Sequence, residues 1–199
     1  DRTYESKTAG QIVRDLASRA SVEVATAEDG INFPAYVFNS QRSNYHHMGD
    51  LADLSGFDLY INADGKLVFE KFIGGKTVHV FEYGKHILEL DFLQSPPRAS
   101  LVEAWGESPS GRGGAESWAW LTKDFSSLKG TAGEGSAKLL LERPVLRTAD
   151  AALTAANAAL TAIKRRTLRG RLLVLGQPQV KLGDAIRLSN LPDAAFNQS

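Results

Sequence analysis

The sequence predicts an α+β fold, in which a small α/β unit with a hairpin precedes a strand-rich region that holds one long helix. Two alternating runs, at 57–61 and 66–70, flank Asp64-Gly65, a pair typical of tight hairpin turns. Strand-like runs then dominate residues 77–105. Residues 149–166 carry small and apolar side chains at helical spacing.

The first two helices are predicted from their capping signals. Thr8 and Gln11 have the spacing of a capping box, which indicates a helix over 9–20. Ser43 is placed to cap a second helix, and Gly56 to end it with a positive φ. One side of this second helix carries Tyr45, Met48, Leu51, Ala52 and Ser55.

The second half of the chain is predicted to be mostly strands and glycine-rich loops. We expect strands at 78–83, 87–92, 100–105, 116–122, 138–142, 170–175 and 185–188. We expect loops at 106–115 and 129–137, where glycine is frequent. The helix over 149–166 has an apolar stripe of Leu153, Ala156, Leu160 and Ile163.

Composition excludes several classes of protein. The chain has 199 residues and no cysteine, so disulfides, thiolate nucleophiles and cysteine-based metal sites are excluded. Basic and acidic residues both number 23, without the basic excess that nucleic-acid binders usually show. No stretch approaches the ~18 consecutive apolar residues of a membrane span. The first residues, Asp1-Arg2-Thr3-Tyr4, do not look like a signal peptide, and we expect the chain to be a fragment of a longer protein.

The four histidines give no convincing metal site. His46 and His47 are adjacent on a predicted helix, where side chains point about 100° apart, and zinc needs three or four converging ligands. His79 and His86 would come close only if their strands paired across residues 83–85. We therefore expect surface or strand histidines and no bound metal.

Other candidate motifs also have simpler structural interpretations. The run Ile73-Gly74-Gly75-Lys76-Thr77 resembles a phosphate-binding loop, but Glu70 stands where that motif needs its first glycine. Asn62, Asp64 and Glu70 do not have the register of a calcium loop. The carboxylate pairs are more typical of solvated faces than of an acid and a base; they are Asp50 with Asp53, and Glu89 with Asp91.

Two further groups of residues suggest surfaces rather than chemistry. The basic run of Lys164, Arg165, Arg166, Arg169 and Arg171 lacks the interleaved aromatic residues of a nucleic-acid groove. We interpret this basic run as a helix end followed by a solvated strand face. Binding of the run to an acidic protein surface stays open. We expect the three tryptophans to fill the core or to lie at a subunit interface; they are Trp105, Trp118 and Trp120.

Two parts of the sequence together carry a family resemblance. The first is LADLSGFDLY at 51–60, followed by DGKLVF at 64–69. The second is the helix at 151–166, followed by GRLLVLGQP at 170–178 and LGDAIRL at 182–188. In this order they resemble the phage late control D proteins. These are baseplate hub proteins of contractile tails, related to the hub part of type VI secretion spike proteins.

The resemblance implies two domains. Residues 1–85 would form an α/β helix–hairpin domain, and residues 86–199 a tail-tube-like antiparallel β-barrel domain packed with helix 149–166. It also implies a homotrimer that adapts the hexameric tail tube to a trimeric spike. Its partners would be tail tube, spike and other baseplate proteins. Its place would be the phage tail baseplate of the virion, after assembly in the bacterial cytoplasm.

The resemblance implies no enzyme, no catalytic, cofactor-binding or metal-binding residue, no membrane and no sequence-specific nucleic acid. Two alternatives stay open. A tail-associated cell-wall hydrolase would need a carboxyl group with a raised pKa in a cleft. A carbohydrate- or peptide-binding module would use the tryptophans.

Overall fold

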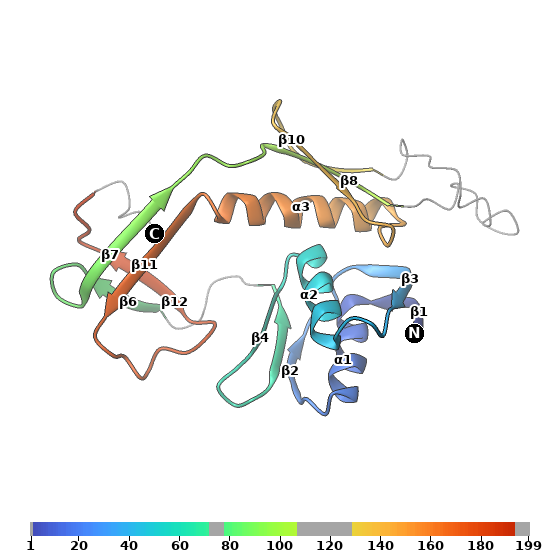
Figure 1. The fold of residues 1–199 in the computed structure, drawn as a ribbon, viewed down its shortest axis with the longest axis horizontal. Helices are drawn as coiled ribbons and strands as arrows, with labels where there is room; N and C mark the ends of the chain where they lie inside the picture. Colours follow the sequence, from blue (N-terminus) through green and yellow to red (C-terminus); the bar gives the residue numbers. More distant parts are fainter. Residues whose placement is uncertain (1, 72–77, 107–128, 194–199) are drawn as a thin grey trace, which may run out of the picture.

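The computed structural model describes residues 2–71, 78–106 and 129–193 (Figure 1). The described chain mixes three helices with several small sheets, and the predicted α+β class is confirmed. Helix α3 (Ala149–Arg165) runs along the long axis of the molecule. A three-stranded sheet lies along one side of α3, and helices α1 and α2 lie on the other (Figure 1).

The first helix begins as its capping box predicts. In α1 (Ala9–Arg19) the Thr8 hydroxyl accepts from the Gln11 amide at 3.2 Å, and the Gln11 side chain accepts from the Thr8 amide at 3.2 Å. Strands β1 (Arg2–Thr8) and β3 (Asn32–Phe38) pair antiparallel on either side of this helix in sequence. Their pairing was not predicted, because β1 buries only Tyr4 and shows no apolar alternation.

The helix–hairpin unit also agrees with its prediction. Ser43 caps α2 (Asn44–Ser55), and Gly56 ends it with a φ of 71°. Strands β4 (Asp58–Ile61) and β5 (Leu67–Glu70) then pair antiparallel. Strand β2 (Val24–Ala27) adds in parallel to the other side of β5. Tyr45 departs from the predicted apolar side of α2, because it lies in the exposed first turn.

The sheet along α3 contains a strand where a loop is predicted. Strand β8 (Leu101–Trp105) lies between β10 (Lys138–Glu142), which is parallel to it, and β9 (Gly130–Gly133), which is antiparallel. The glycines of β9 do not mark a loop. A Cβ on Gly130 would lie 2.1 Å from backbone atoms of Ala152 and Leu153, so only glycine lets the strand approach the helix this closely.

The remaining strands lie beyond the C-terminal end of α3 (Figure 1). Strand β6 (Val78–Glu82) pairs in parallel with β12 (Ala185–Ser189), and β7 (Ile87–Gln94) pairs antiparallel with β11 (Leu168–Val174). These described strands form two separate two-stranded sheets and do not close into a barrel. The domain boundary at 85/86 falls between β6 and β7 and stays a prediction.

Strands β6 and β7, whose pairing would bring His79 and His86 together, do not pair with each other. One isolated bridge, between Tyr83 and Ile87, joins the two segments in the described chain. Strand β6 instead pairs with β12, 107 residues further along the chain, and β7 pairs with β11, 74–87 residues further along. A short sequence between two strands favours a hairpin, but burial of Phe81 and Ile87 against Leu191 favours the long-range pairs.

The main hydrophobic core joins the N-terminal unit to α3 and its sheet. Its largest fully buried side chains include Phe33, Phe69, Ile12, Leu16, Leu51 and Leu146. The same cluster contains Val102 of β8 and the alanine-rich face of α3. The second cluster is far smaller, with Phe81, Ile87 and Leu191 as its buried members. The described N-terminal unit and α3 therefore share one core.

Tyr4 shows how a strand without an apolar pattern is held. Its hydroxyl donates to Asp15 Oδ2 at 2.6 Å, and the same carboxylate oxygen receives Arg2 at 3.2 Å and Arg19 at 2.8 Å. Burial, and then the adjacent Asp15 carboxylate, raise the pKa of Tyr4 to about 12. The folded protein therefore favours the neutral phenol.

We expect this tyrosine to make the protein less stable in alkali. In the unfolded chain a tyrosine ionises near pH ~10. The contribution of Tyr4 to the free energy of unfolding is therefore complete below that pH. It is lost as pH rises from ~10 toward the folded pKa of about 12. Urea unfolding of wild type and Tyr4→Phe across this interval measures it. The wild type should lose ~1–2 kcal/mol more than the variant. Parallel pH profiles would refute the assignment.

Candidate interaction surface

Three adjoining hollows surround the C-terminal half of α3. One has a volume of about 790 Å³ and lies between α3 and the end of α2; its walls include Ser55, Phe57, Lys71, Asn157 and Arg165. A second has a volume of about 510 Å³ and lies between α2, α3 and β10. A third, of about 140 Å³, lies beside residues 95–98. Arg166 lines all three.

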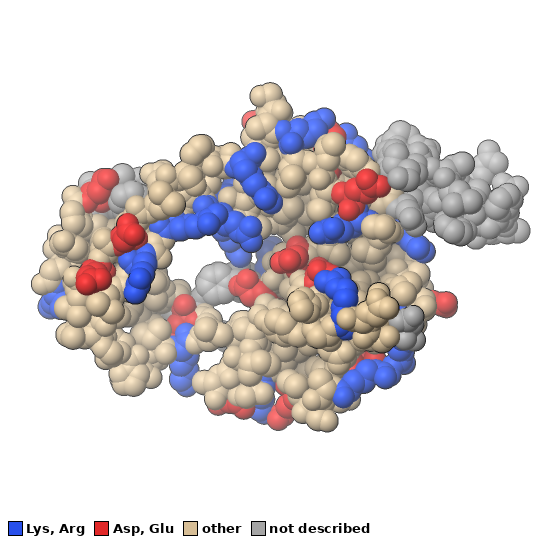
Figure 2. Space-filling view, viewed as in Figure 1, with Lys and Arg blue, Asp and Glu red and all other residues tan. Residues whose placement is uncertain are grey.

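We call the second and third hollows together the arginine groove. Its apolar lining comes from Leu54 of α2, Ala159 and Ala162 of α3, Val145, and two leucines of β10. Its basic side chains come from four separate segments: Arg42, Arg98, Arg143, Arg166 and Arg169. Figure 2 shows Lys and Arg side chains gathered over the C-terminal end of α3 and the strands beside it.

Local structure explains why these side chains line the groove. Leu139 and Leu141 alternate along β10 with exposed neighbours, so both point to one face of the sheet. Arg166 is the C-cap of α3, where a cation interacts favourably with the helix dipole. Tyr36 closes the base of the groove, and burial, followed by the nearby charge of Asp50, raises the pKa of its phenol.

Most of the groove's positive charge has no carboxylate partner. Arg42 forms an ion pair with Asp50 at 2.6 Å. Arg98, Arg143 and Arg166 are exposed, and no carboxylate lies within ion-pair distance of any of them in the described parts of the chain. Asp53 is the other acidic residue in the lining. The groove therefore presents a net positive charge above an apolar floor.

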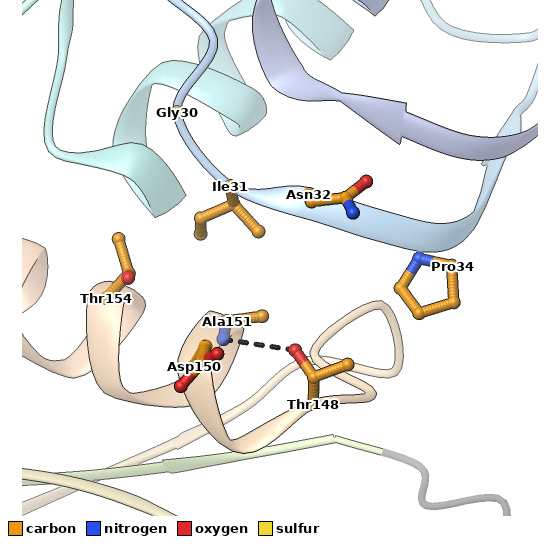
Figure 3. Close-up of a pocket in the computed structure, with 8 residues that line it drawn as sticks. All are labelled: Gly30, Ile31, Asn32, Pro34, Thr148, Asp150, Ala151 and Thr154. Atoms are coloured by element: carbon orange, nitrogen blue, oxygen red, sulfur yellow. Dashed lines mark hydrogen bonds between the residues drawn. The ribbon is translucent and has the colours of Figure 1, made fainter.

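A further hollow, between β3 and the start of α3, has a structural explanation. It has a volume of about 260 Å³, and Figure 3 shows Ile31, Asn32 and Pro34 on one side and the first turn of α3 on the other. The Thr148 hydroxyl accepts from the Ala151 amide at 3.2 Å, which caps the helix (Figure 3). Asp150 lies in the same first turn, where a negative charge stabilises the helix dipole.

The four histidines lie in four different structural settings. His46 contacts the capping Ser43 hydroxyl at 2.8 Å, and His86 accepts from the Glu82 amide at 3.1 Å. His47 is buried between the Tyr36 hydroxyl at 2.9 Å and the Asn39 carbonyl at 3.0 Å. Among the described residues, no three His, Asp or Glu side chains are grouped so that they could hold a metal ion.

His79 instead fixes the loop before β12. Its Nε2 lies 2.8 Å from Asp184 Oδ2, which also accepts from the Lys181 amide at 2.9 Å. The backbone hydrogen bond, and then His79, lower the pKa of Asp184. In the same loop a Cβ on Gly183 would lie 2.6 Å from the Tyr60 hydroxyl, which places the loop against β4.

The acidic pairs considered in the sequence lie on two different elements, α2 and β7. Asp50 is held by Arg42. On the β7–β11 pair, Asp91 lies opposite Arg171 and Glu89 lies opposite Leu173. The hydrolase hypothesis needs a carboxyl group with a raised pKa, whereas the pKa shifts at Glu103 and Asp184 are downward. Two lysines cause the shift at Glu103, namely Lys129 at 2.6 Å and Lys138 at 3.1 Å.

The other sequence candidates have structural roles or lie outside the described residues. Asn62 Oδ1 accepts from the amides of Asp64 and Lys66, so it shapes the hairpin turn. Trp105 lies at the end of β8. The described part of the chain has no helix that is long and apolar enough to cross a membrane. Residues 73–77, Trp118 and Trp120 lie outside the described residues.

Sequence reasoning located only one side of the arginine groove. It singled out a basic run of Lys164, Arg165, Arg166, Arg169 and Arg171, of which Arg166 and Arg169 line the groove. It missed Arg42, Arg98 and Arg143, since these residues come from distant segments and each is isolated among unrelated neighbours in the sequence.

No protein-family model and no curated protein matches the chain. Solved structures do resemble it. The 43 kDa tail protein of prophage MuSo2 from Shewanella oneidensis superposes with a TM-score of 0.70 at 14% identity, over 99% of this chain. A tail protein from Neisseria meningitidis MC58 gives a TM-score of 0.60 at 12% identity, over 94% of it. A chain of the native gene transfer agent virion gives a TM-score of 0.65 at 17% identity, also over 94% of this chain.

These similarities show the fold. The chain shares its architecture with phage tail proteins and with a virion protein. It spans only part of each of them, namely 60%, 58% and 42% of their lengths.

Proposed function

We propose that this chain is a structural subunit of a phage tail or a related injection system, with no enzymatic role. The observation that carries the proposal is the shared fold, at TM-scores of 0.60–0.70 over at least 94% of the chain, with two tail proteins and a virion protein. More specifically, we propose the baseplate hub, a homotrimer that joins a hexameric tail tube to a trimeric spike.

The segments that resemble hub proteins support the finer assignment. Residues 51–69 cover the C-terminal part of α2, β4 and most of β5, and residues 151–188 cover most of α3, β11 and most of β12. These elements contribute to both hydrophobic clusters of the fold. The resemblance therefore concerns residues that determine the architecture rather than isolated surface positions.

Exposed apolar side chains on β6, β7, β11 and β12 support the proposal that the chain assembles with other subunits. Large hydrophobic residues are exposed on all four strands, including Val80 of β6, Leu93 of β7, Leu173 of β11 and Ile186 of β12. Monomeric proteins rarely expose many such residues close together, whereas subunit interfaces do. The same strands bury only a small cluster of their own, so contact with neighbouring subunits would add to their stability.

Measurement of mass in solution, combined with electron microscopy, tests the proposal. We expect a trimer that forms ring-shaped particles. Leu93→Asp should shift the protein toward monomer. The same substitution at Leu140, another exposed leucine, which lies on β10, should not. A wild-type protein that stays monomeric at all concentrations and does not associate with a hexameric tail tube would rule out the hub assignment.

A further inference from the structure

We propose that the arginine groove binds an extended acidic segment of a partner protein, with carboxylate and apolar side chains in alternation. This inference is independent of the proposed hub assignment, because it requires only the groove of a single chain. The groove combines an apolar floor with exposed guanidinium groups from separate segments.

The floor would accept apolar side chains at the spacing of a strand. Leu139 and Leu141 of β10 stay partly exposed in the folded chain, and Val145 and Ala159 continue the apolar surface. Strand β10 forms an edge of its described sheet, paired with β8 on one side. An extended peptide can run along such an edge, where main-chain hydrogen bonds add affinity and alternate side chains enter the groove.

The guanidinium groups would accept the carboxylates of the same segment. Arg98, Arg143 and Arg166 have no carboxylate partner among the described residues, whereas Arg42 is already paired with Asp50. Arginine forms bidentate hydrogen bonds with carboxylates, so three such groups above an apolar floor favour a segment with acidic and apolar residues. Asp53, the other acidic residue of the lining, forms no ion pair among the described residues, and it would disfavour carboxylates placed next to α2.

Nucleic acid fits the same groove less well. Arginine also binds phosphate, but single-stranded nucleic acid gains much of its affinity from bases that stack on aromatic side chains. Tyr36 is the aromatic residue of this lining, and its hydroxyl is occupied by His47 at 2.9 Å. The aliphatic floor offers no stacking platform, so an acidic peptide is the preferred ligand.

Fluorescence anisotropy with a labelled peptide of alternating Glu and Leu tests the inference. We expect saturable binding that weakens as salt rises, because exposed ion pairs are screened. Replacement of every Glu by Gln in the peptide should weaken binding by about tenfold or more. Arg143→Glu and Arg166→Glu should each weaken it by a similar factor, and Leu141→Asn should weaken it through loss of apolar contact.

Arg187→Glu is the matched control, since it makes the same charge change on exposed β12, away from the groove. It should leave affinity within about twofold of wild type, as expected for a charge outside the binding surface. Circular dichroism and thermal melting of each variant separate lost binding from lost folding, and Arg143→Gln and Arg166→Gln repeat the test with a smaller change.

Three outcomes would overturn the inference. The first is absence of binding by the folded wild type. The second is equal affinity in the groove variants and in Arg187→Glu. The third is tighter binding of labelled oligodeoxythymidine than of the peptide, weakened by the same arginine variants, which would identify a nucleic-acid groove instead. None of these outcomes bears on trimer formation, so the hub proposal is tested separately.

Discussion

Leu160→Ala is expected to lower the free energy of unfolding by about 2–5 kcal/mol, the range for removing a buried leucine side chain. Leu160 is 8% exposed and belongs to the main core. Its Cδ2 lies so near the backbone of β9 that a Cβ on Gly133 would come within 2.9 Å of it. Loss of this side chain would leave a cavity between α3 and its sheet, and the close backbone contact at Gly130 limits how far the sheet can collapse into it.

Leu153→Ala is the matched control for this prediction. It is the same substitution in the same helix, but Leu153 is 45% exposed. Leu153→Ala should change the free energy of unfolding by no more than about 0.5 kcal/mol, as for most surface substitutions. Urea unfolding followed by circular dichroism measures both variants. Equal losses would mean that the buried face of α3 is placed incorrectly.

The same two leucines show where the sequence pattern was insufficient. Both belong to the predicted apolar stripe, yet only Leu160 is buried. The buried face of α3 is instead mostly alanine, including Ala152, Ala155 and Ala156, and the helix packs against β8, β9 and α2. Hydrophobic periodicity gives most weight to large side chains, whereas close packing of a helix on a glycine-containing strand selects small ones.

Local signals predicted local structure well. The capping box at Thr8, the cap at Ser43, the positive φ of Gly56 and the Asp64-Gly65 turn all depend on interactions within a few residues. The sequence therefore indicated α1, α2 and the β4–β5 hairpin. Strand pairing depends on burial between distant segments, so β6 with β12 and β1 with β3 had no local signal.

The candidate interaction surface was less predictable for the same reason. Arg166 belongs to a visible basic run, but Arg98 follows Pro96-Pro97 and Arg143 precedes Pro144, with no pattern that links them. The fold brings them to one groove because β10 and α3 pack against a shared core. A charge pattern in sequence can indicate a basic helix end, but not the opposite wall that makes it a groove.

Phe69→Ala is expected to cost about 3–5 kcal/mol of unfolding free energy, the range for truncating a buried aromatic residue. Phe69 is fully buried on β5, the central strand of its sheet. Its ring packs edge-on against Phe57, with centroids 5.1 Å apart. Ile61→Ala, on the exposed side of the neighbouring β4, should cost far less, because Ile61 is 45% exposed.

This variant also tests whether the N-terminal unit and α3 unfold together. Phe57, whose ring packs on Phe69, follows Gly56, where a Cβ would lie 3.0 Å from Ala158 of α3. Phe57 and Ala158 also line the same hollow. Both regions belong to one hydrophobic cluster. We therefore expect a single shifted transition by far-UV circular dichroism and tryptophan fluorescence, since a shared core couples the two regions. Two separate transitions in Phe69→Ala would show that α3 and its sheet fold without the helix–hairpin unit, contrary to one continuous core.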